Sequence, residues 1–194
     1  MNSVTSLIQE IKSCTHCQEH LPLPPNPVVS FSRESRILVV GQAPGIKVHE
    51  TSIPWNDPSG DRLRQWLDVS REEFYNPKLF AIVPMGFCYP GKGKSGDLPP
   101  RPECAELWNE PILKLLKNIQ LTLLVGQYAQ NFYLNDSKKK TLTLTIQHFK
   151  EYLPDYFVLP HPSPRNNIWL KKNPWFEKET LPKLKRELKR ALKH

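Results

Sequence analysis

The chain has 194 residues, a hydrophobic fraction of 39% and a formal net charge of +8 at pH 7, and its mean hydropathy is negative. This composition predicts one soluble globular domain over residues 1–194. It excludes a membrane protein, because no apolar run approaches the roughly 20 residues of a membrane-spanning helix. The excess of 27 Lys and Arg over 19 Asp and Glu favours a polyanionic partner.

The N-terminal residues 1–12 predict an amphipathic helix. Val4, Leu7, Ile8 and Ile11 recur at helical spacing with polar residues between them. A signal peptide has instead a continuous apolar core. We therefore expect a cytoplasmic protein.

Four apolar runs, each followed by a turn rich in glycine or proline, predict strands at Ile37–Val40, Leu79–Val83, Leu121–Val125 and Tyr156–Leu159. Helical patterns separate them, near residues 59–68, at 103–119 and from Gly126-Gln127 onward. Strands that alternate with helices favour a three-layer α/β/α fold with a central, mainly parallel four-stranded sheet. Ligands bind such sheets at the carboxyl ends of the strands.

Three other segments carry more specific expectations. Residues 84–102 form a long loop, which is usually functional or disordered. Residues 141–146 alternate threonine with apolar residues, so they form an edge strand or a loose insertion. Residues 181–193 form a basic amphipathic helix, whose charges are either a solvated face or a face that follows phosphates. The apolar positions expected to face inward are Leu107, Ile112, Leu113, Leu115 and Leu116 in the helix at 103–119, and Leu181, Leu184, Leu188 and Leu192 in the last helix.

The first predicted strand runs into the loop Gly41-Gln42-Ala43-Pro44-Gly45. Its glycines let a ligand approach main-chain N–H groups at the end of the strand. An ordinary tight turn between a strand and a helix explains the same residues equally well.

All four cysteines of the chain fall beside predicted loops. Cys14 and Cys17 form a CxxC pair, whereas Cys88 and Cys104 are separated by fifteen residues. Disulfides are improbable in a reducing cytoplasm. Four converging thiolates fit a [4Fe–4S] cluster or a zinc site made only of cysteines, and the alternative is four unrelated cysteines. We expect His16, between the CxxC cysteines, to be exposed and not to be a ligand.

Several short motifs follow one another along the chain. Gly41-Gln42-Ala43-Pro44-Gly45 is followed by Pro54-Trp55, by Ser59-Gly60 with Leu63, and by His161-Pro162-Ser163-Pro164-Arg165-Asn166. In this order, and together with the cysteine layout, they resemble the uracil-DNA glycosylase superfamily and its branch with an iron–sulfur cluster. The last motif is similar to that of the single-strand-selective monofunctional glycosylases. The resemblance spans about residues 14–166.

The resemblance implies a monofunctional DNA glycosylase that hydrolyses the N-glycosidic bond of uracil or another deaminated or damaged base in base excision repair. It implies a monomer acting on single- or double-stranded DNA, with a [4Fe–4S] cluster or zinc on Cys14, Cys17, Cys88 and Cys104. Trp55 would stack on the flipped base, while His161 and the Gly41–Gly45 main chain stabilise the departing base anion. The implied base- and DNA-binding residues are Gly41, Ala43, Pro44, Gly45, Trp55, Ser163, Arg165 and Asn166.

Two positions depart from the family pattern. The acid of the first motif is replaced by Gln42, so water activation falls to Glu50 or Asp57, or is helped mainly by His161. The asparagine that reads the uracil edge is replaced by Pro84, which has neither N–H nor a polar side chain. These departures leave two other hypotheses open: a non-catalytic iron–sulfur protein that binds nucleic acid or a nucleobase, and an enzyme acting on free nucleosides or RNA bases.

The segment after the last motif supplies candidate DNA contacts. Arg165, Lys171 and Lys172 are candidates for phosphate binding. One of Ile168, Trp169 and Leu170 would wedge into the base stack where the flipped nucleotide leaves it. The alternative is that these apolar residues only pack on the last helix.

Overall fold

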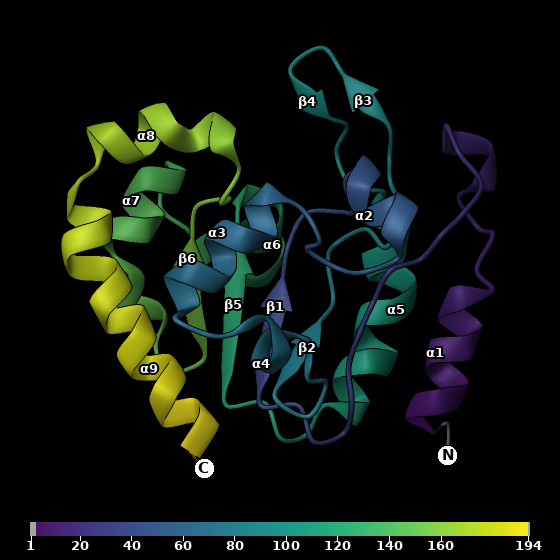
Figure 1. Cartoon of the computed structure of the whole chain (residues 1–194), viewed down its shortest axis with the longest axis horizontal. Helices are drawn as coiled ribbons and strands as arrows, with labels where there is room; N and C mark the ends of the chain where they lie inside the picture. The colour runs from purple at the N-terminus through teal and green to yellow at the C-terminus, as the bar shows by residue number, and fades with distance from the viewer. Residues whose placement is uncertain (1–2, 194) are drawn as a thin grey trace.

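The computed structural model describes residues 3–193 and shows a three-layer α/β/α fold (Figure 1). Four strands form the central sheet: β1 (Ile37–Val40), β2 (Phe80–Ile82), β5 (Leu121–Val125) and β6 (Tyr156–Leu159). They lie in the order β2-β1-β5-β6, and all three pairings are parallel. The predicted central sheet is therefore confirmed.

The sheet is buried on both faces, as the continuous apolar runs of its strands require. The chain leaves β1 toward β2 through α2 (Ile46–Thr51), α3 (Pro58–Leu67) and α4 (Arg71–Tyr75). It returns past β1 to β5 through α5 (Pro102–Leu115), and reaches β6 through α6 (Gln127–Leu134) and α7 (Leu142–Gln147). Because these crossovers move in opposite directions along the sheet, right-handed connections place α3 and α5 on opposite faces.

The two ends of the chain cover the flanks of this core. Helix α1 (Val4–Lys12) contacts α5, and α9 (Leu181–Lys193) packs against α3, β1 and β5 (Figure 1). Short helices lead into α9: α8 (Asn167–Lys172) and a π-helical turn at Phe176–Thr180. The predicted N-terminal helix is confirmed from Val4 onward, and its first two residues lie outside the described residues.

The structure corrects the expectation for residues 141–146. They begin helix α7, in which the Thr141 side chain accepts a hydrogen bond from the Leu144 N–H at 3.2 Å and so caps the helix. The Thr145 hydroxyl donates to the Thr141 carbonyl at 3.0 Å. The threonines therefore stabilise or tolerate a helix here, through hydrogen bonds from their side chains to the helix backbone, and do not form the strand that their propensity suggested.

The helix predicted at 103–119 is also corrected in extent and in its buried face. Helix α5 ends at Leu115, and Leu107 and Leu113 are 42% and 38% exposed. Ile112 and Leu116 are buried as predicted and Leu115 is partly buried, whereas Ala105 and Asn109 take the inward places expected for Leu107 and Leu113. The buried stripe is therefore rotated relative to the one that the leucines suggested.

Several further elements were not predicted, among them α4 and α8. The loop at 84–102 contains an antiparallel hairpin of β3 (Lys92–Gly93) and β4 (Gly96–Asp97), and α2 follows directly after Gly45. The last helix has the predicted bounds, with Leu184 and Leu188 buried and Leu181 and Leu192 only partly buried. Within residues 3–193, no helix is both long and apolar enough to span a membrane.

Candidate functional site: a cleft at the strand ends and a cysteine pocket

The loops that follow β1, β2, β5 and β6 line one cleft at the carboxyl ends of the strands. These four loops contribute, in order, Gly41–Gly45, Pro84, Gly126 and His161. The segment before α3 adds Trp55 and Asp57. Ser163, Arg165 and Asn166 complete one rim. The structure thus brings together in this cleft the predicted catalytic residues and the base- and DNA-binding residues of the motifs, except Glu50, which is exposed on α2 and does not line the cleft.

The first loop is held by its carbonyl groups. The Gly41 carbonyl accepts from the Met85 N–H at 3.0 Å, and that of Gln42 accepts from Gly86 at 2.9 Å. No acceptor among residues 3–193 takes the N–H groups of Gln42 and Ala43. A pair of main-chain donors at the end of a buried strand is the type of group that stabilises a developing anion.

Trp55 lies between the first loop and His161. Its ring centroid is 5.6 Å from that of His161, and a Cβ on Gly41 would lie 2.7 Å from Trp55 Cζ2. Glycine at position 41 is therefore needed for the indole to occupy this place. Trp55 has a φ of 56°, a left-handed conformation that is rare for a bulky residue and that often marks functional loops.

The start of α3 holds the Trp55 loop in this strained conformation. The Trp55 carbonyl accepts from Nη1 of the buried Arg64 at 3.3 Å, and a Cβ on Gly60 would lie 1.7 Å from the same carbonyl oxygen. Asp57 Oδ1 accepts from the Gly60 N–H at 2.8 Å and caps the helix. The Ser59-Gly60 pair is therefore a close packing site between the loop and the helix.

His161 is set up as a neutral hydrogen-bond donor. The Ser163 N–H donates to His161 Nδ1 at 3.2 Å, so the proton of the neutral ring is on Nε2. Burial lowers the pKa of the imidazole, and the Asp57 carboxylate partly opposes this effect. Asn166 Nδ2 donates to the His161 carbonyl at 2.7 Å and fixes the loop. The imidazole therefore has a free Nε2–H group at neutral pH.

The β3–β4 hairpin borders the cleft. Its Ser95, Gly96 and Asp97 line the cleft, and Arg165 Nη1 donates to the Ser95 carbonyl at 2.8 Å. Gln42 Nε2 donates to the Leu98 carbonyl at 3.3 Å, and burial raises the pKa of Asp97. These residues were not predicted from the sequence, although the glycine- and lysine-rich run 91–97 after a predicted strand was a signal for them.

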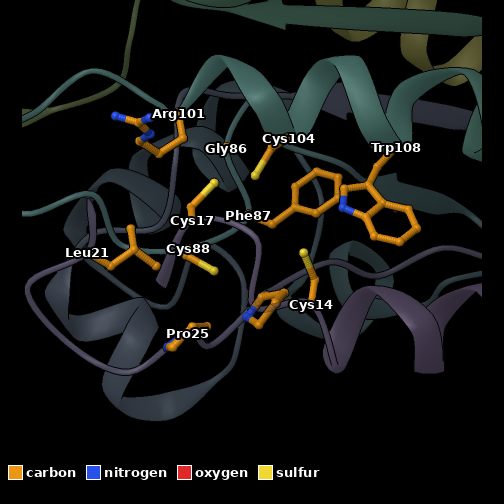
Figure 2. A pocket seen from close by; sticks show the side chains of 11 residues that line it. Cys14, Cys17, Leu21, Pro25, Gly86, Phe87, Cys88, Arg101, Cys104 and Trp108 are labelled. Atoms are coloured by element: carbon orange, nitrogen blue, oxygen red, sulfur yellow. The ribbon is translucent and has the colours of Figure 1, made fainter. Parts of the chain in front are cut away.

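The four cysteines line a second, separate pocket. Cys14 follows α1, Cys17 precedes a short 3₁₀ turn, Cys88 lies in the loop after β2, and Cys104 is in the first turn of α5. Figure 2 shows the four sulfur atoms around this pocket, with Phe87 and Trp108 beside them. All four cysteines are free thiols, and His16 is exposed, as expected.

Four thiols are the donor type of the metal centre that the resemblance implies, although they do not form a metal-binding group in this arrangement. Burial, and secondarily the neighbouring cysteines, raise the pKa of Cys88 to about 11 and that of Cys104 to about 12. Arg101 Nε and Trp108 Nε1 are buried beside the thiols without a hydrogen-bond partner. Such N–H groups suit anionic sulfur. Within residues 3–193, however, no three His, Cys, Asp or Glu side chains are grouped closely enough to hold a metal ion as they stand.

Comparison with known families decides the identity of the fold. The family model of the uracil DNA glycosylase superfamily matches residues 29–185, which include the whole sheet and every loop of the cleft. The chain belongs to the uracil DNA glycosylase superfamily. Membership supports a DNA glycosylase-like function and binding to DNA.

The superfamily match includes Cys88 and Cys104 but begins after Cys14 and Cys17. The N-terminal half of the cysteine pocket therefore lies outside the matched residues. Within them, the cleft of this uracil DNA glycosylase superfamily member has Pro84, a buried residue of the loop after β2, and Gln42, whose amide donates to the Leu98 carbonyl just after the hairpin.

Proposed function

We propose that this protein is a monofunctional DNA glycosylase that hydrolyses the N-glycosidic bond of uracil or another deaminated or damaged base. The observation that carries the proposal is the arrangement around His161. Its Nδ1 accepts the Ser163 N–H, and its free Nε2–H lies in the same cleft as the Gln42 and Ala43 amides. Neutral donors on two loops suit a leaving base that carries negative charge.

In the reaction, the bond between C1′ of the sugar and the base nitrogen breaks, and the base takes both bonding electrons. The nucleotide must first leave the duplex stack, and Trp55 offers a ring on which the flipped base stacks. The amides of the first loop and the His161 Nε2–H would donate to the base anion. Water adds to C1′ and loses a proton, which leaves an abasic sugar and the free base.

Asp57 is the carboxylate that we propose for water activation. It lies in the cleft and acts electrostatically on His161, and only its Oδ1 is engaged in capping α3. Glu50 is exposed outside the cleft, and the Gln42 amide cannot take a proton. Of the carboxylates named from the sequence, Asp57 therefore has the required position.

Ile168 is the side chain that we propose as the wedge into the base stack. It is 68% exposed on α8, next to the second motif. Trp169 donates from Nε1 to Thr143 Oγ1 at 2.9 Å and packs on Trp175, and Leu170 is partly buried. Arg165, Lys171 and Lys172 remain candidates for phosphate contacts beside it.

For the cysteine pocket we propose a structural [4Fe–4S] cluster, with zinc as the alternative. The four thiols, together with the unpartnered N–H groups of Arg101 and Trp108, support an anionic sulfur-rich group. When bound, such a cluster would tie the N-terminal segment to the loop after β2 and to α5. Broad visible absorption with matched iron and sulfide would identify the cluster, whereas colourless protein containing zinc would select the alternative.

The deciding experiment is base release from oligonucleotides that carry uracil, hypoxanthine, xanthine or no lesion, each single- and double-stranded. Protein prepared anaerobically should release one of these lesion bases, and His161→Ala should lower the rate by about 100-fold or more. Lys117→Ala, at an exposed position just after α5 and outside the cleft, serves as the control. Absence of release from every substrate, or unchanged release by His161→Ala, would contradict the proposal.

The second candidate is a non-catalytic protein that binds DNA or a nucleobase. The engagement of Gln42 with the hairpin and the lack of any polar group on Pro84 favour it. Tight binding to lesion-containing DNA without base release, unaffected by His161→Ala, would select this candidate.

A further inference from the structure

Helix α9 carries a disproportionate share of the charge of the molecule. Its residues 181–193 include six Lys and Arg and one Glu, a net +5 out of the +8 of the whole chain. None of these residues lines the cleft. In Figure 1, α9 runs along one flank of the sheet, away from the β3–β4 hairpin. The charge of α9 therefore lies outside the proposed catalytic site.

The cations form a continuous strip on the outer side of the helix. Lys185, Arg186, Lys189, Arg190 and Lys193, here called the α9 basic face, recur at helical spacing and line one shallow hollow with Pro182. A neighbouring hollow shares Pro182 and Arg186, and adds Lys150, His148 and Lys183. Two basic hollows thus meet at Arg186.

Few acidic groups oppose this strip. Asp68 lies 3.8 Å from Lys185 Nζ and 3.6 Å from Lys189 Nζ, distances that give weak, exposed ion pairs. Glu187 is only 5% exposed and forms ion pairs with Lys183 and Arg190, both at 2.8 Å, so its charge is already compensated. Glu179 lines the second hollow. Among the described residues, Arg186 and Lys193 have no carboxylate within 4.0 Å.

We propose that the α9 basic face binds the phosphate backbone of double-stranded DNA, as a second contact surface outside the cleft. The choice of DNA as the polyanion rests on the proposed function and on membership of the superfamily. From Lys185 to Lys193 the helix rises about 12 Å, which matches about three to four phosphates along one strand. The surface holds DNA without reading its sequence, and so keeps the protein on undamaged duplex between lesions.

The test compares two triple variants with the same net charge of +5, because each removes three cations from +8. Arg186→Gln, Lys189→Gln and Lys193→Gln together remove exposed members of the α9 basic face. The control replaces Lys78, Lys114 and Lys117 by Gln, all of them exposed and outside both hollows. Glutamine keeps helix propensity, and circular dichroism checks that both variants fold.

Fluorescence anisotropy with undamaged duplex DNA over a range of salt concentrations gives the readout. The α9 variant should bind about tenfold more weakly or worse at low salt, and the slope of log affinity against log salt should fall by about 0.9 for each lost contact. The control should keep the slope of the wild type. Equal losses in both variants, or an unchanged slope in the α9 variant, would overturn the proposal. Loss of binding to anionic lipid vesicles by the α9 variant, with normal binding to duplex DNA, would also overturn the proposal.

Failure of the proposed function would be seen separately. His161→Ala should keep the binding that depends on α9 and lose base release. One outcome is that the wild type releases no base while the salt slopes of DNA binding still differ between the wild type and the α9 variant. In that case the proposed α9 contact with DNA is supported and the catalytic proposal is wrong. If base release is confirmed and the wild type and the α9 variant have the same salt slope, only the proposal that the α9 basic face binds DNA is wrong.

Discussion

At the scale of single residues, His161 shows how a loop tunes a side chain. The Ser163 N–H occupies Nδ1, and burial lowers the pKa of the ring. Both features favour the neutral tautomer with the proton on Nε2. In the proposed reaction, such a neutral donor would stay in the same protonation state from one leaving base to the next, and it would not repel the cations proposed to contact DNA.

His161 should titrate below the ordinary histidine pKa of about 6.5. NMR of the imidazole nitrogens, assigned with His161→Gln, would measure this midpoint and the tautomer. The sign for stability follows by linkage. As pH falls through 6.5, the unfolded chain takes up a proton that folded His161 resists, so this residue lowers the free energy of unfolding under acid conditions. A midpoint at or above 6.5 would contradict the proposed environment.

At the scale of elements, the close packing of the Trp55 loop on α3 requires a residue without a Cβ at position 60. Alanine in place of glycine inside a helix usually stabilises it by about 0.5–1 kcal/mol. At position 60, however, the added Cβ would meet the Trp55 carbonyl oxygen at 1.7 Å. Backbone cannot yield as a flexible side chain does, so the steric effect outweighs the gain in propensity.

Gly60→Ala should therefore lower the free energy of unfolding by about 1–3 kcal/mol. Urea denaturation would measure the change. Gln65→Ala, at an exposed position of the same helix, should stay within about 0.5 kcal/mol of the wild type. If both variants are equally stable, the close contact between the loop and the helix is wrong.

The β3–β4 hairpin is joined to the second motif by Arg165. A Cβ on Gly96, which has a φ of 146°, would lie 2.1 Å from Arg165 Nη1, so the guanidinium packs directly on this glycine. Arg165→Ala should free the hairpin and raise amide hydrogen exchange at residues 92–97 up to about fivefold, since one exposed hydrogen bond contributes about 1 kcal/mol or less. Lys94→Ala removes a cation from the same hairpin without this contact, and should leave exchange unchanged. Equal exchange in both variants would show that Arg165 does not hold the hairpin.

At the scale of the whole molecule, the elements predicted correctly are those that a local pattern of apolar residues along the chain defines. The strands follow from continuous apolar runs, and α9 follows from leucines at helical spacing, because burial on both faces or on one stripe leaves a local signature. The buried face of α5 was only partly predicted, since Leu107 and Leu113 fit a helical stripe with Ile112 as well as Ala105 and Asn109 do. Only contact with neighbouring elements chooses between these faces.

In the candidate site, too, the features with a local sequence pattern were predicted and those that depend on tertiary contacts were not. Parallel strands brought the predicted loops together at one edge, so Gly41–Gly45, Asp57 and His161 could be named from the sequence. Glu50 was equally plausible there but lies on the outer side of α2. The hairpin residues 95–97 were missed, because their place in the cleft depends on a fold of the loop that has no strong local pattern.

The cysteine pocket joins parts of the chain that are far apart in sequence, and a metal centre there would act on the stability of the whole domain. Cys88→Ala should lower the melting temperature by several degrees and abolish bound metal, because metal binding couples to folding. Removal of metal by a chelator should destabilise the wild type to a similar extent, yet have little further effect on Cys88→Ala, since both act on the same interaction. Thr15→Ala, at an exposed position inside the CxxC pair, should retain metal and melt like the wild type. If Cys88→Ala keeps its metal, or if chelation destabilises it as much as the wild type, the thiol of Cys88 is not a ligand.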